Sequence, residues 1–460
     1  MSFLEKIIEP RKQIPEERKR FDNSFLKQLI VPLFIEQLLL MVVGMADTMM
    51  VTYAGEATVS GVSLDTMFYT IFIFMFTAVG TGGAVIVSQY IGSRDEEKAN
   101  ISASQIFFIA LVFSTACMIL VLVFGNGIIA LLYGAADPDV QEACRVYLRI
   151  VAISFPANAV YNAGTALYRS MGKTSTTMKV SIAMNLINIA GNAIGIFVLH
   201  AGAAGVAWPT TISWYFAAIV MTALCFNKRH PVYITIKNIF KPNGDMIRRI
   251  LKVAVPNSIE SGLFQAAKVF LGSIIATFGT AQIAANGIGQ TIWSVAACVS
   301  SSMAPAFVTV IGQCIGAKDT EAADYYLWKM TRITTLLAAV WNILILVLLP
   351  VILPLYDISA ETRSLLITIV IIHNIFCGSI GALFGPFSAG LRAAGDVKFT
   401  MYASIFCTVI FRTALSIVLA VWLNMGVIDI AMAMVSDWTL KAIILVIRQK
   451  SGKWLQHQLI

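Results

Sequence analysis

The chain has 460 residues, of which 58% are hydrophobic and only 13% are charged, and its mean hydropathy is +0.79. A soluble protein of this size carries about 25% charged residues, so the composition excludes the soluble classes and predicts an all-α polytopic membrane protein. In such a protein the net charge of +8 reports on membrane topology, and we expect no nucleic acid partner.

The first residues form a polar, basic segment that contains Pro10 and Pro15 and has no leading apolar run. This pattern argues against a cleavable signal peptide. It predicts instead a cytoplasmic, basic amphipathic arm over residues 1–27 that lies on the membrane surface.

Apolar runs of about 20 residues, the length that crosses a hydrocarbon core, alternate with turn signals and predict twelve spanning helices. The first six are expected to form an N-terminal lobe (28–226) and the last six a C-terminal lobe (249–450), joined by a cytoplasmic linker (227–248) and followed by a cytoplasmic tail (451–460). The predicted helices lie near residues 28–52, 62–90, 101–124, 138–165, 174–199, 204–226, 249–278, 286–314, 322–350, 361–388, 397–422 and 427–448.

The lysines and arginines fall almost entirely on one side of this arrangement. Of the 33, 27 lie before the first helix, in or beside the even-to-odd loops, or at and after the end of the last helix, whereas the opposite side has Arg145, Arg149 and Arg363. Because cytoplasmic loops carry the excess of positive charge, we expect both termini in the cytoplasm and the chain in the cell membrane.

The two lobes are related by an internal repeat. Without a gap, QYIGSRDEEKA (89–99) aligns on QCIGAKDTEAA (313–323), and further along YRSMGK (168–173) aligns on LRAAGD (391–396). Since each half holds six helices, both keep the same orientation, as in a parallel repeat about an axis along the membrane normal. Two such lobes around a central cleft are typical of a transporter.

The first predicted helix carries two carboxylates, although a charge at the middle of a membrane helix costs roughly 2.5–3.5 kcal/mol. Glu36 and Asp47 are eleven residues apart, so they differ by only about 20° around the helix and share one face. That face is expected to point toward protein or water. Asp47 has no obvious basic partner nearby, which favours a functional role. Glu36 and its repeat mate Glu260 are predicted to contact substrate, with a structural role as the alternative.

Other polar residues in the predicted helices extend the candidate site. Lys268, Arg412 and His373 are predicted to line the cleft, each with a structural role as the alternative. Asp437 and Lys441, at i,i+4, are expected to pair with each other. In helix 5, Asn188 and Asn192 share a face, where amides can bind a cation or hold helices together.

Motifs for other chemistry are missing from the sequence. There is no HExxH, GxSxG or nucleotide-binding pattern, and the seven cysteines form no CxxC pair. We therefore expect no enzyme activity, no metal site and no cofactor other than a coupling ion.

Six segments together resemble the multidrug and toxic compound extrusion (MATE) transporters over essentially the whole chain. They are VGMADTMMV (43–51), GTGGAVIVSQYIG (80–92), ALYRSMGKT (166–174), VPNSIESGLFQ (255–265), IGQCIGAKD (311–319) and GLRAAGD (390–396). The resemblance implies that Asp47 binds or exchanges the coupling cation. The helix-5 pattern Asn-x-x-x-Asp of the family falls on Asn188 and Asn192, so an amide stands here in place of the acid. An acid of the NorM-like branch falls on Gly381, and the sequence looks nearer the DinF-like branch.

The sequence therefore predicts a secondary active efflux transporter that exchanges H⁺ or Na⁺ for an organic, amphipathic and cationic drug or metabolite. The coupling cation would bind Asp47, Asn188 and Asn192, and the substrate would meet Glu36, Glu260, Lys268, Arg412 and His373. The expected partners are a small molecule and the lipid bilayer, and the chain is expected to act as a monomer. The alternatives are a flippase for lipid-linked precursors, which would need a basic cleft, and an ion channel.

Overall fold

The computed structural model describes residues 7–133, 137–275, 278–356, 358–422 and 426–460. The described residues are helical with short connections, which confirms the predicted all-α class. They form two compact units. The N-terminal unit comprises Ser24–Ser258, and the C-terminal unit comprises Ile259–Ile460 together with the residues up to Asn23.

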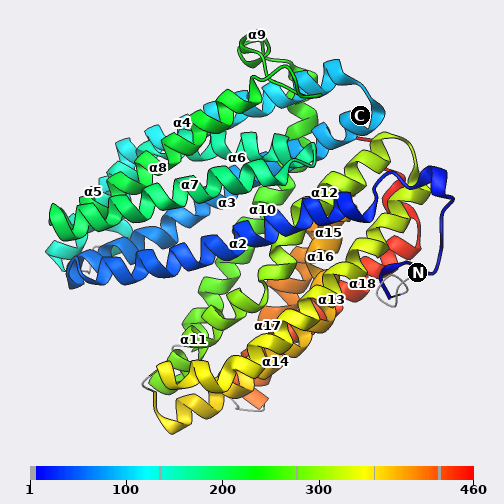
Figure 1. The fold of residues 1–460 in the computed structure, drawn as a ribbon. Coiled ribbons are helices and arrows are strands. Elements are labelled where there is room, and N and C mark those ends of the chain that lie inside the picture. The colour runs from blue at the N-terminus through cyan, green and yellow to red at the C-terminus, as the bar shows by residue number, and fades with distance from the viewer. Residues whose placement is uncertain (1–6, 134–136, 276–277, 357, 423–425) are drawn as a thin grey trace. The chain divides into compact units, whose positions relative to one another are not determined.

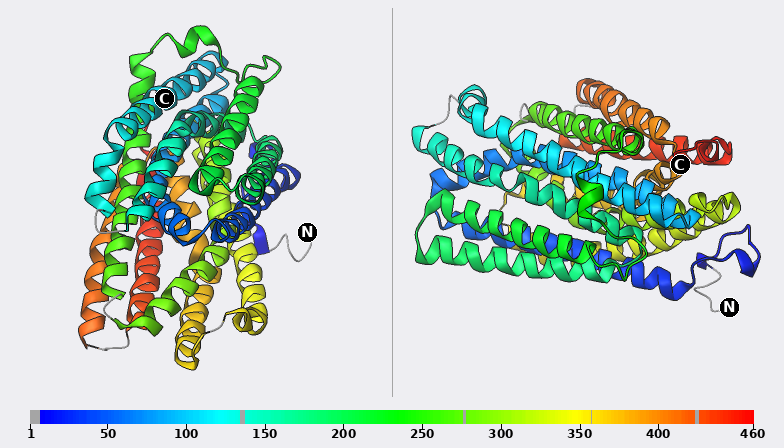
Figure 2. Two further views of the ribbon diagram at one scale, coloured as in Figure 1. Left: turned by 90° about the vertical axis from the view of Figure 1, so that its left-hand side faces the viewer. Right: turned by 90° about the horizontal axis from the view of Figure 1, so that it is seen from above.

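In the N-terminal unit the helices run alongside one another (Figures 1 and 2), and α3 packs against α4, α5 and α6. The helix bounds are α2 (Asn23–Thr52), α3 (Glu56–Ser93), α4 (Glu96–Tyr133), α5 (Pro138–Ile153), α6 (Phe155–Ser170), α7 (Thr174–Ala193) continued by the π-helix η2 (Ile194–Val198), α8 (Gly202–Cys225) and the short α9 (Ile236–Ile239).

The helix α10 (Gly244–Ile275) connects the two units: it begins in the N-terminal unit and continues into the C-terminal unit from Ile259. The apolar core of the C-terminal unit includes buried side chains of α10, α13, α14 and α18. The remaining helices are α11 (Thr280–Ala296), α12 (Cys298–Gly316), α13 (Thr320–Ile352), α14 (Ala360–Phe384), α15 (Pro386–Ala393), α16 (Val397–Ser404) continued by the π-helix η5 (Ile405–Phe411), α17 (Arg412–Trp422) and α18 (Val427–Lys450).

Within the described residues, ten helices are long and apolar enough to cross a membrane. The pair α5 and α6 counts as an eleventh span if both helices cross together. The pair is bent by 45° at Ser154, and Pro156 lies in the first turn of α6. The remaining predicted span, near 249–278, coincides with α10, which carries Glu260 and Lys268. This helix is not among the ten that are apolar enough to cross a membrane. Residues 276–277 of the predicted span lie outside the described residues.

The backbone repeats between the two units as the sequence does. Gly55 and Gly279 begin α3 and α11 with φ of 96° and 99°, and Arg94 and Lys318 follow α3 and α12 with φ of 60° and 59°. A non-glycine residue with positive φ is uncommon. Its recurrence at both positions therefore shows that the repeat extends to the turn geometry.

The arm that precedes α2 lies against α13 of the C-terminal unit, and its position on a membrane surface stays a prediction. Glu9 accepts a hydrogen bond from Lys329 Nζ at 2.7 Å and another from the hydroxyl of Tyr325, and both members of the ion pair are nearly buried. The backbone N–H of Phe21 donates to the Tyr326 hydroxyl at 2.9 Å, and this hydroxyl donates to the backbone oxygen of Phe21 at 2.8 Å. Residues 1–6 of the predicted arm lie outside the described residues, and residues 23–27 begin α2.

The docking of the arm is expected to weaken when Glu9 takes up a proton. Burial by itself raises the pKa of Glu9, but the hydrogen bonds from Lys329 and Tyr325 and the charges of Lys329 and Lys19 outweigh it and hold the pKa below its usual range. Because the pKa of Glu9 is lower in the docked state, Glu9 stabilises docking fully at pH values above its undocked pKa. That contribution is lost as the pH falls through the lowered value.

Replacing Glu9 by glutamine should release the arm, because Lys329 then stays buried without its counter-charge. We expect trypsin to cut at Arg11 and Lys12 about tenfold faster, which corresponds to about 1.4 kcal/mol of lost docking free energy. The matched control is Glu16→Gln, because Glu16 is 85% exposed in its contact with Lys19. Equal cleavage rates in both variants would contradict a docking role for Glu9.

Candidate functional site

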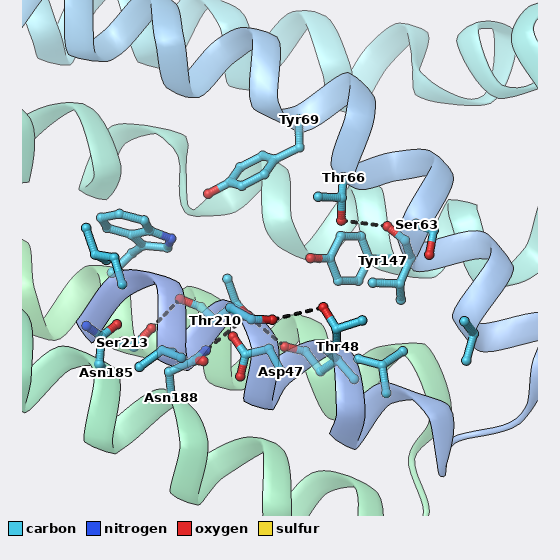
Figure 3. Close-up of a pocket in the computed structure, with 18 of the residues that line it drawn as sticks. Asp47, Thr48, Ser63, Thr66, Tyr69, Tyr147, Asn185, Asn188, Thr210 and Ser213 are labelled. Carbon is cyan, nitrogen blue, oxygen red and sulfur yellow. Dashed lines mark hydrogen bonds between the residues drawn. The ribbon is translucent and has the colours of Figure 1, made fainter. Parts of the chain in front are cut away.

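A cavity of about 550 Å³ lies inside the N-terminal unit, between α2, α3, α5, α7 and α8. Its wall is mostly apolar, and Asp47 is the one charged side chain among the described residues that line it. Polar and aromatic lining residues are Thr48, Ser63, Thr66, Tyr69, Tyr147, Asn185, Asn188, Thr210, Ser213 and Trp214. Figure 3 shows Asp47, Asn188 and Thr210 together on one wall, with Tyr69 and Tyr147 on the other.

Close helix contacts bring the polar residues together. A Cβ on Gly191 would lie 2.6 Å from Pro209 Cβ, and a Cβ on Gly195 would lie 2.1 Å from the backbone oxygen of Gly205. Small residues at such crossings let membrane helices approach closely. The α7–α8 contact therefore holds Thr210, next to Pro209, against Asn188 on α7.

Two amides surround the carboxylate of Asp47. Asn192 donates from Nδ2 to Asp47 Oδ1 at 2.9 Å. With its amide nitrogen turned toward Asp47, Asn188 donates to the two carboxylate oxygens at 3.1 and 3.0 Å, and its own oxygen accepts from Thr210 Oγ1 at 3.2 Å. Asn188 is 7% exposed and Asn192 is 1% exposed, whereas Asp47 is half-buried beside the cavity.

This arrangement can exist in more than one protonation or binding state. With their nitrogens toward Asp47, the two amide groups donate to an ionised carboxylate and so stabilise its charge. A protonated Asp47 could donate to an amide oxygen instead. Rotation of the amides would turn their oxygens toward a hard cation such as Na⁺, which prefers oxygen ligands of this type. Among the described residues, no group of three His, Cys, Asp or Glu side chains could hold a metal ion.

The structure thus brings together the three residues predicted for the coupling cation, Asp47, Asn188 and Asn192. It adds Thr210 on α8, which the sequence analysis missed. A single threonine in an apolar helix gives no signal of its own, since threonines often bond back to the preceding turn, as Thr210 also does to Val206 at 2.9 Å.

Glu36 lies apart from this cavity, about three helical turns before Asp47 on α2. Arg169 donates from Nη2 to Glu36 Oε1 at 3.0 Å, and Thr177 donates to Oε2 at 3.3 Å. Glu36 is 3% exposed, so its charge is already matched by a neighbouring helix. These contacts correspond to the structural alternative for Glu36 and leave its predicted substrate role as a prediction.

Glu260 forms the repeat-related ion pair in the C-terminal unit. Arg392 donates to Glu260 Oε2 at 2.9 Å, and Lys441 Nζ lies 3.7 Å from Oε1. The expected i,i+4 pair between Asp437 and Lys441 is therefore wrong, because Lys441 pairs with Glu260 while Asp437 faces Arg412 at 3.9 Å.

The remaining predicted cleft residues also lie in the C-terminal unit. Lys268 is exposed, and its Nζ lies 6.0 Å from the centre of the Phe264 ring. His373 is buried against Trp438, with ring centres 5.8 Å apart, and neither ring nitrogen has a hydrogen-bond partner among the described residues. Arg412 is buried near both, close enough for its charge to act on each of them.

The acid of the N-terminal cavity has no counterpart in the C-terminal unit. The alignment that places Glu36 on Glu260 takes Asp47 to Leu271, a buried apolar residue of α10. The two units therefore share an ion pair and turn geometry, but only the N-terminal unit carries the carboxylate with its amides.

Known proteins resemble the chain along nearly its whole length. The family pattern MatE matches residues 32–194 and 254–418. An uncharacterized transporter, YisQ of Bacillus subtilis, is 29% identical over 453 residues, covering 95% of this chain and 97% of that protein. A probable multidrug resistance protein NorM of Thermotoga maritima is 23% identical and covers 97% of this chain and 95% of that protein. The solved structure of a MOP superfamily transporter from Pyrococcus furiosus superposes with a TM-score of 0.87, at 20% identity, over 97% of this chain and 100% of that one.

Proposed function

The chain belongs to the MatE family of multidrug efflux transporters, multi-pass membrane proteins, and on that basis we propose that it is a secondary active antiporter. It would export an organic compound in exchange for H⁺ or Na⁺, with access alternating between the two sides of the membrane. The observation that supports this most directly is the cavity in which Asp47 is the one charged group among the described lining residues.

A single carboxylate can couple two fluxes when its two ligands exclude each other. An ion can shift a conformational equilibrium only by the difference in its affinity for the two states. Asp47 supplies such a difference, because its charge disappears when a proton binds and is balanced when Na⁺ binds. A substrate that needs the ionised carboxylate is then expelled when the coupling ion arrives.

Both coupling ions are compatible with the residues around Asp47. A proton needs only the carboxylate, with the amides of Asn188 and Asn192 turning to accept from it. Sodium would need the oxygens of Asp47, Asn188, Asn192 and Thr210 together, and the buried Oδ1 of Asn192 has no hydrogen-bond partner among the described residues. Asn192 cannot itself take up a proton at ordinary pH, so any proton in this cluster belongs to Asp47.

The chemistry of the cavity suits an amphipathic organic cation. Met67 and Met184 offer adaptable apolar surface, and the rings of Tyr69, Tyr147 and Trp214 offer faces that attract cations. Asp47 would balance the positive charge. Since Glu36 and Glu260 are already paired with arginines, Asp47 is the carboxylate best placed to meet a cationic group.

The placement of the protein in the cell follows from its charge pattern. We propose that the chain lies in the cell membrane with both termini in the cytoplasm, because 27 of its 33 basic residues fall on the side of the termini. We further propose that it acts as a monomer, since residues of the N-terminal unit alone line the Asp47 cavity.

Counter-transport in proteoliposomes tests the proposal. Vesicles holding purified protein are loaded with ethidium, and either a pH or a Na⁺ gradient is imposed. We expect one gradient to drive ethidium out several times faster than in vesicles without protein. An ionophore that collapses that gradient should abolish the difference. Ion conductance without ethidium movement would indicate a channel, and movement of a lipid-linked pyrophosphate without ethidium movement would indicate a flippase.

A further inference from the structure

A second acid, Asp65, is buried in the N-terminal unit and plays no part in the coupling cluster. It lies on α3 and is 1% exposed, and neither carboxyl oxygen has a hydrogen-bond partner among the described residues. The peptide group of Leu148 on α5 approaches it, but without the geometry of a hydrogen bond. Native proteins leave few buried polar groups unsatisfied, so each one requires an explanation.

The helices on either side of Asp65 are closely packed. One turn before it, a Cβ on Gly61 would lie 2.8 Å from Ala143 Cβ, and Cys144 Sγ lies 3.5 Å from the backbone oxygen of Gly61. Residues four apart share a helix face, so Asp65 follows Gly61 on the face of α3 that meets α5. The carboxyl is therefore enclosed between two packed helices.

No positive charge compensates the carboxyl among the described residues. The titratable groups that face it are Cys144 and Tyr147 of α5, with Tyr69 one turn away on its own helix. The two arginines of α5 are engaged elsewhere, since Arg145 pairs with Glu142 at 3.1 Å and Arg149 donates to Asn126 at 3.1 Å. The described parts of α4 and α6 bring no charged side chain against Asp65.

An enclosed carboxylate without partners is the costliest form that an acid can take. Moving an isolated charge out of water is so unfavourable that such a group takes up a proton instead. Even the neutral acid leaves its hydroxyl unsatisfied, which costs on the order of 1–3 kcal/mol. Burying an apolar residue at this position would avoid that cost, so packing alone does not explain the acid.

Tyr147 connects Asp65 to the cavity. Its ring lines the cavity that holds Asp47, and its hydroxyl lies within electrostatic reach of both acids. The neighbour of Asp65 on α3, Thr66, lines the same cavity, and Figure 3 shows Thr66 beside Tyr147. The buried acid is thus next in sequence to Thr66 of the cavity wall, and Tyr147 of the same wall is sensitive to the charge of both acids.

We propose that Asp65 is a second proton-binding site of the N-terminal unit, linked electrostatically to Asp47 in the neighbouring cavity. The proposal deepens the antiport function by adding a carboxyl that holds a proton while Asp47 is ionised. The link is electrostatic, because a charge on one of the two acids disfavours a charge on the other.

Infrared spectroscopy of the purified full chain tests this without any transport assay. At neutral pH the wild type should show the carbonyl band of a protonated carboxyl, and Asp65→Asn should lose it. The control Asp95→Asn should keep the band, because hydrogen bonds from Lys98 and its charge hold the pKa of Asp95 below its usual range. If Asp65→Asn does not fold, Asp65→Leu serves as the second variant, since it removes an unsatisfied acid from a packed interface.

Titration of the same band tests the link to the cavity. Asp47→Asn removes a negative charge near Asp65, so Asp65 should lose its proton more readily and the band should disappear at a lower pH than in the wild type, by on the order of one pH unit for interacting acids. A band that survives Asp65→Asn and Asp65→Leu overturns the proton site. A band that vanishes in them but titrates identically in wild type and Asp47→Asn overturns the link. Failure of ethidium export would overturn the antiport proposal alone, because the infrared result does not depend on it.

Discussion

Replacing Asp47 by asparagine should abolish gradient-driven export of ethidium, with a loss of at least about a hundredfold in initial rate, or about 2.7 kcal/mol. The variant keeps the size and the hydrogen-bonding capacity of the side chain but cannot change its charge. Because an ion drives transport only through differential affinity for two states, an amide at this position removes the difference. The rate should then no longer respond to the imposed gradient.

Two controls separate coupling from folding. Glu56→Gln changes an exposed acid in the first turn of α3 and should leave ethidium export unchanged. Asp47→Glu keeps an ionisable group and should retain a measurable response to the gradient, although the longer side chain disturbs the contact with Asn192. Export by Asp47→Asn at the wild-type rate under the same gradient would show that Asp47 is structural.

Replacing Glu36 by glutamine should destabilise the N-terminal unit by about 3 kcal/mol, seen as a lower midpoint of thermal unfolding in detergent, because breaking a buried ion pair leaves the remaining charge uncompensated. That loss exceeds what the pair itself contributes. Arg169 is 26% exposed at its side chain, which places the loss at the lower end of the usual range. Glu260→Gln should cost more, because it leaves both Arg392 and Lys441 without their acid.

The double variant Glu36→Gln with Arg169→Gln makes this prediction specific. Removing both charges should recover part of the lost stability, because no unpaired charge remains. A double variant that is as unstable as the sum of the two single ones would show that the pair contributes nothing as a pair. If Glu36→Gln is fully stable but exports no ethidium, Glu36 serves the substrate, as the sequence also allowed.

The internal repeat held a signal for the two ion pairs that helical periodicity does not contain. The repeat places Glu36 on Glu260 and, in its later segment, Arg169 on Arg392, so both partners recur together. Each arginine was counted with the loops because it lies beyond the predicted end of its helix. Only the fold shows that the end of α6 lies beside α2, and the end of α15 beside α10, which brings acid and arginine into contact.

Other features depended on tertiary contacts that leave no local pattern. The helical class and the repeat follow from apolar runs and identical segments, and the face shared by Glu36 and Asp47 follows from helix geometry. Thr210, by contrast, reaches Asn188 beside Asp47 only because glycines let α7 and α8 approach closely. The contact of the arm with α13 also left no local pattern, because its partner, Lys329, lies in the other half of the chain.

That separation has a consequence for the order of synthesis. Glu9 emerges from the ribosome 320 residues before Lys329, and translation at about 5–20 residues per second makes this interval roughly 15–60 s. Throughout that time the arm has no docking site, although α2, which directly follows it, is already available to the membrane. Docking of the arm is therefore a late event in biogenesis, and it can take place only once α13 has been made.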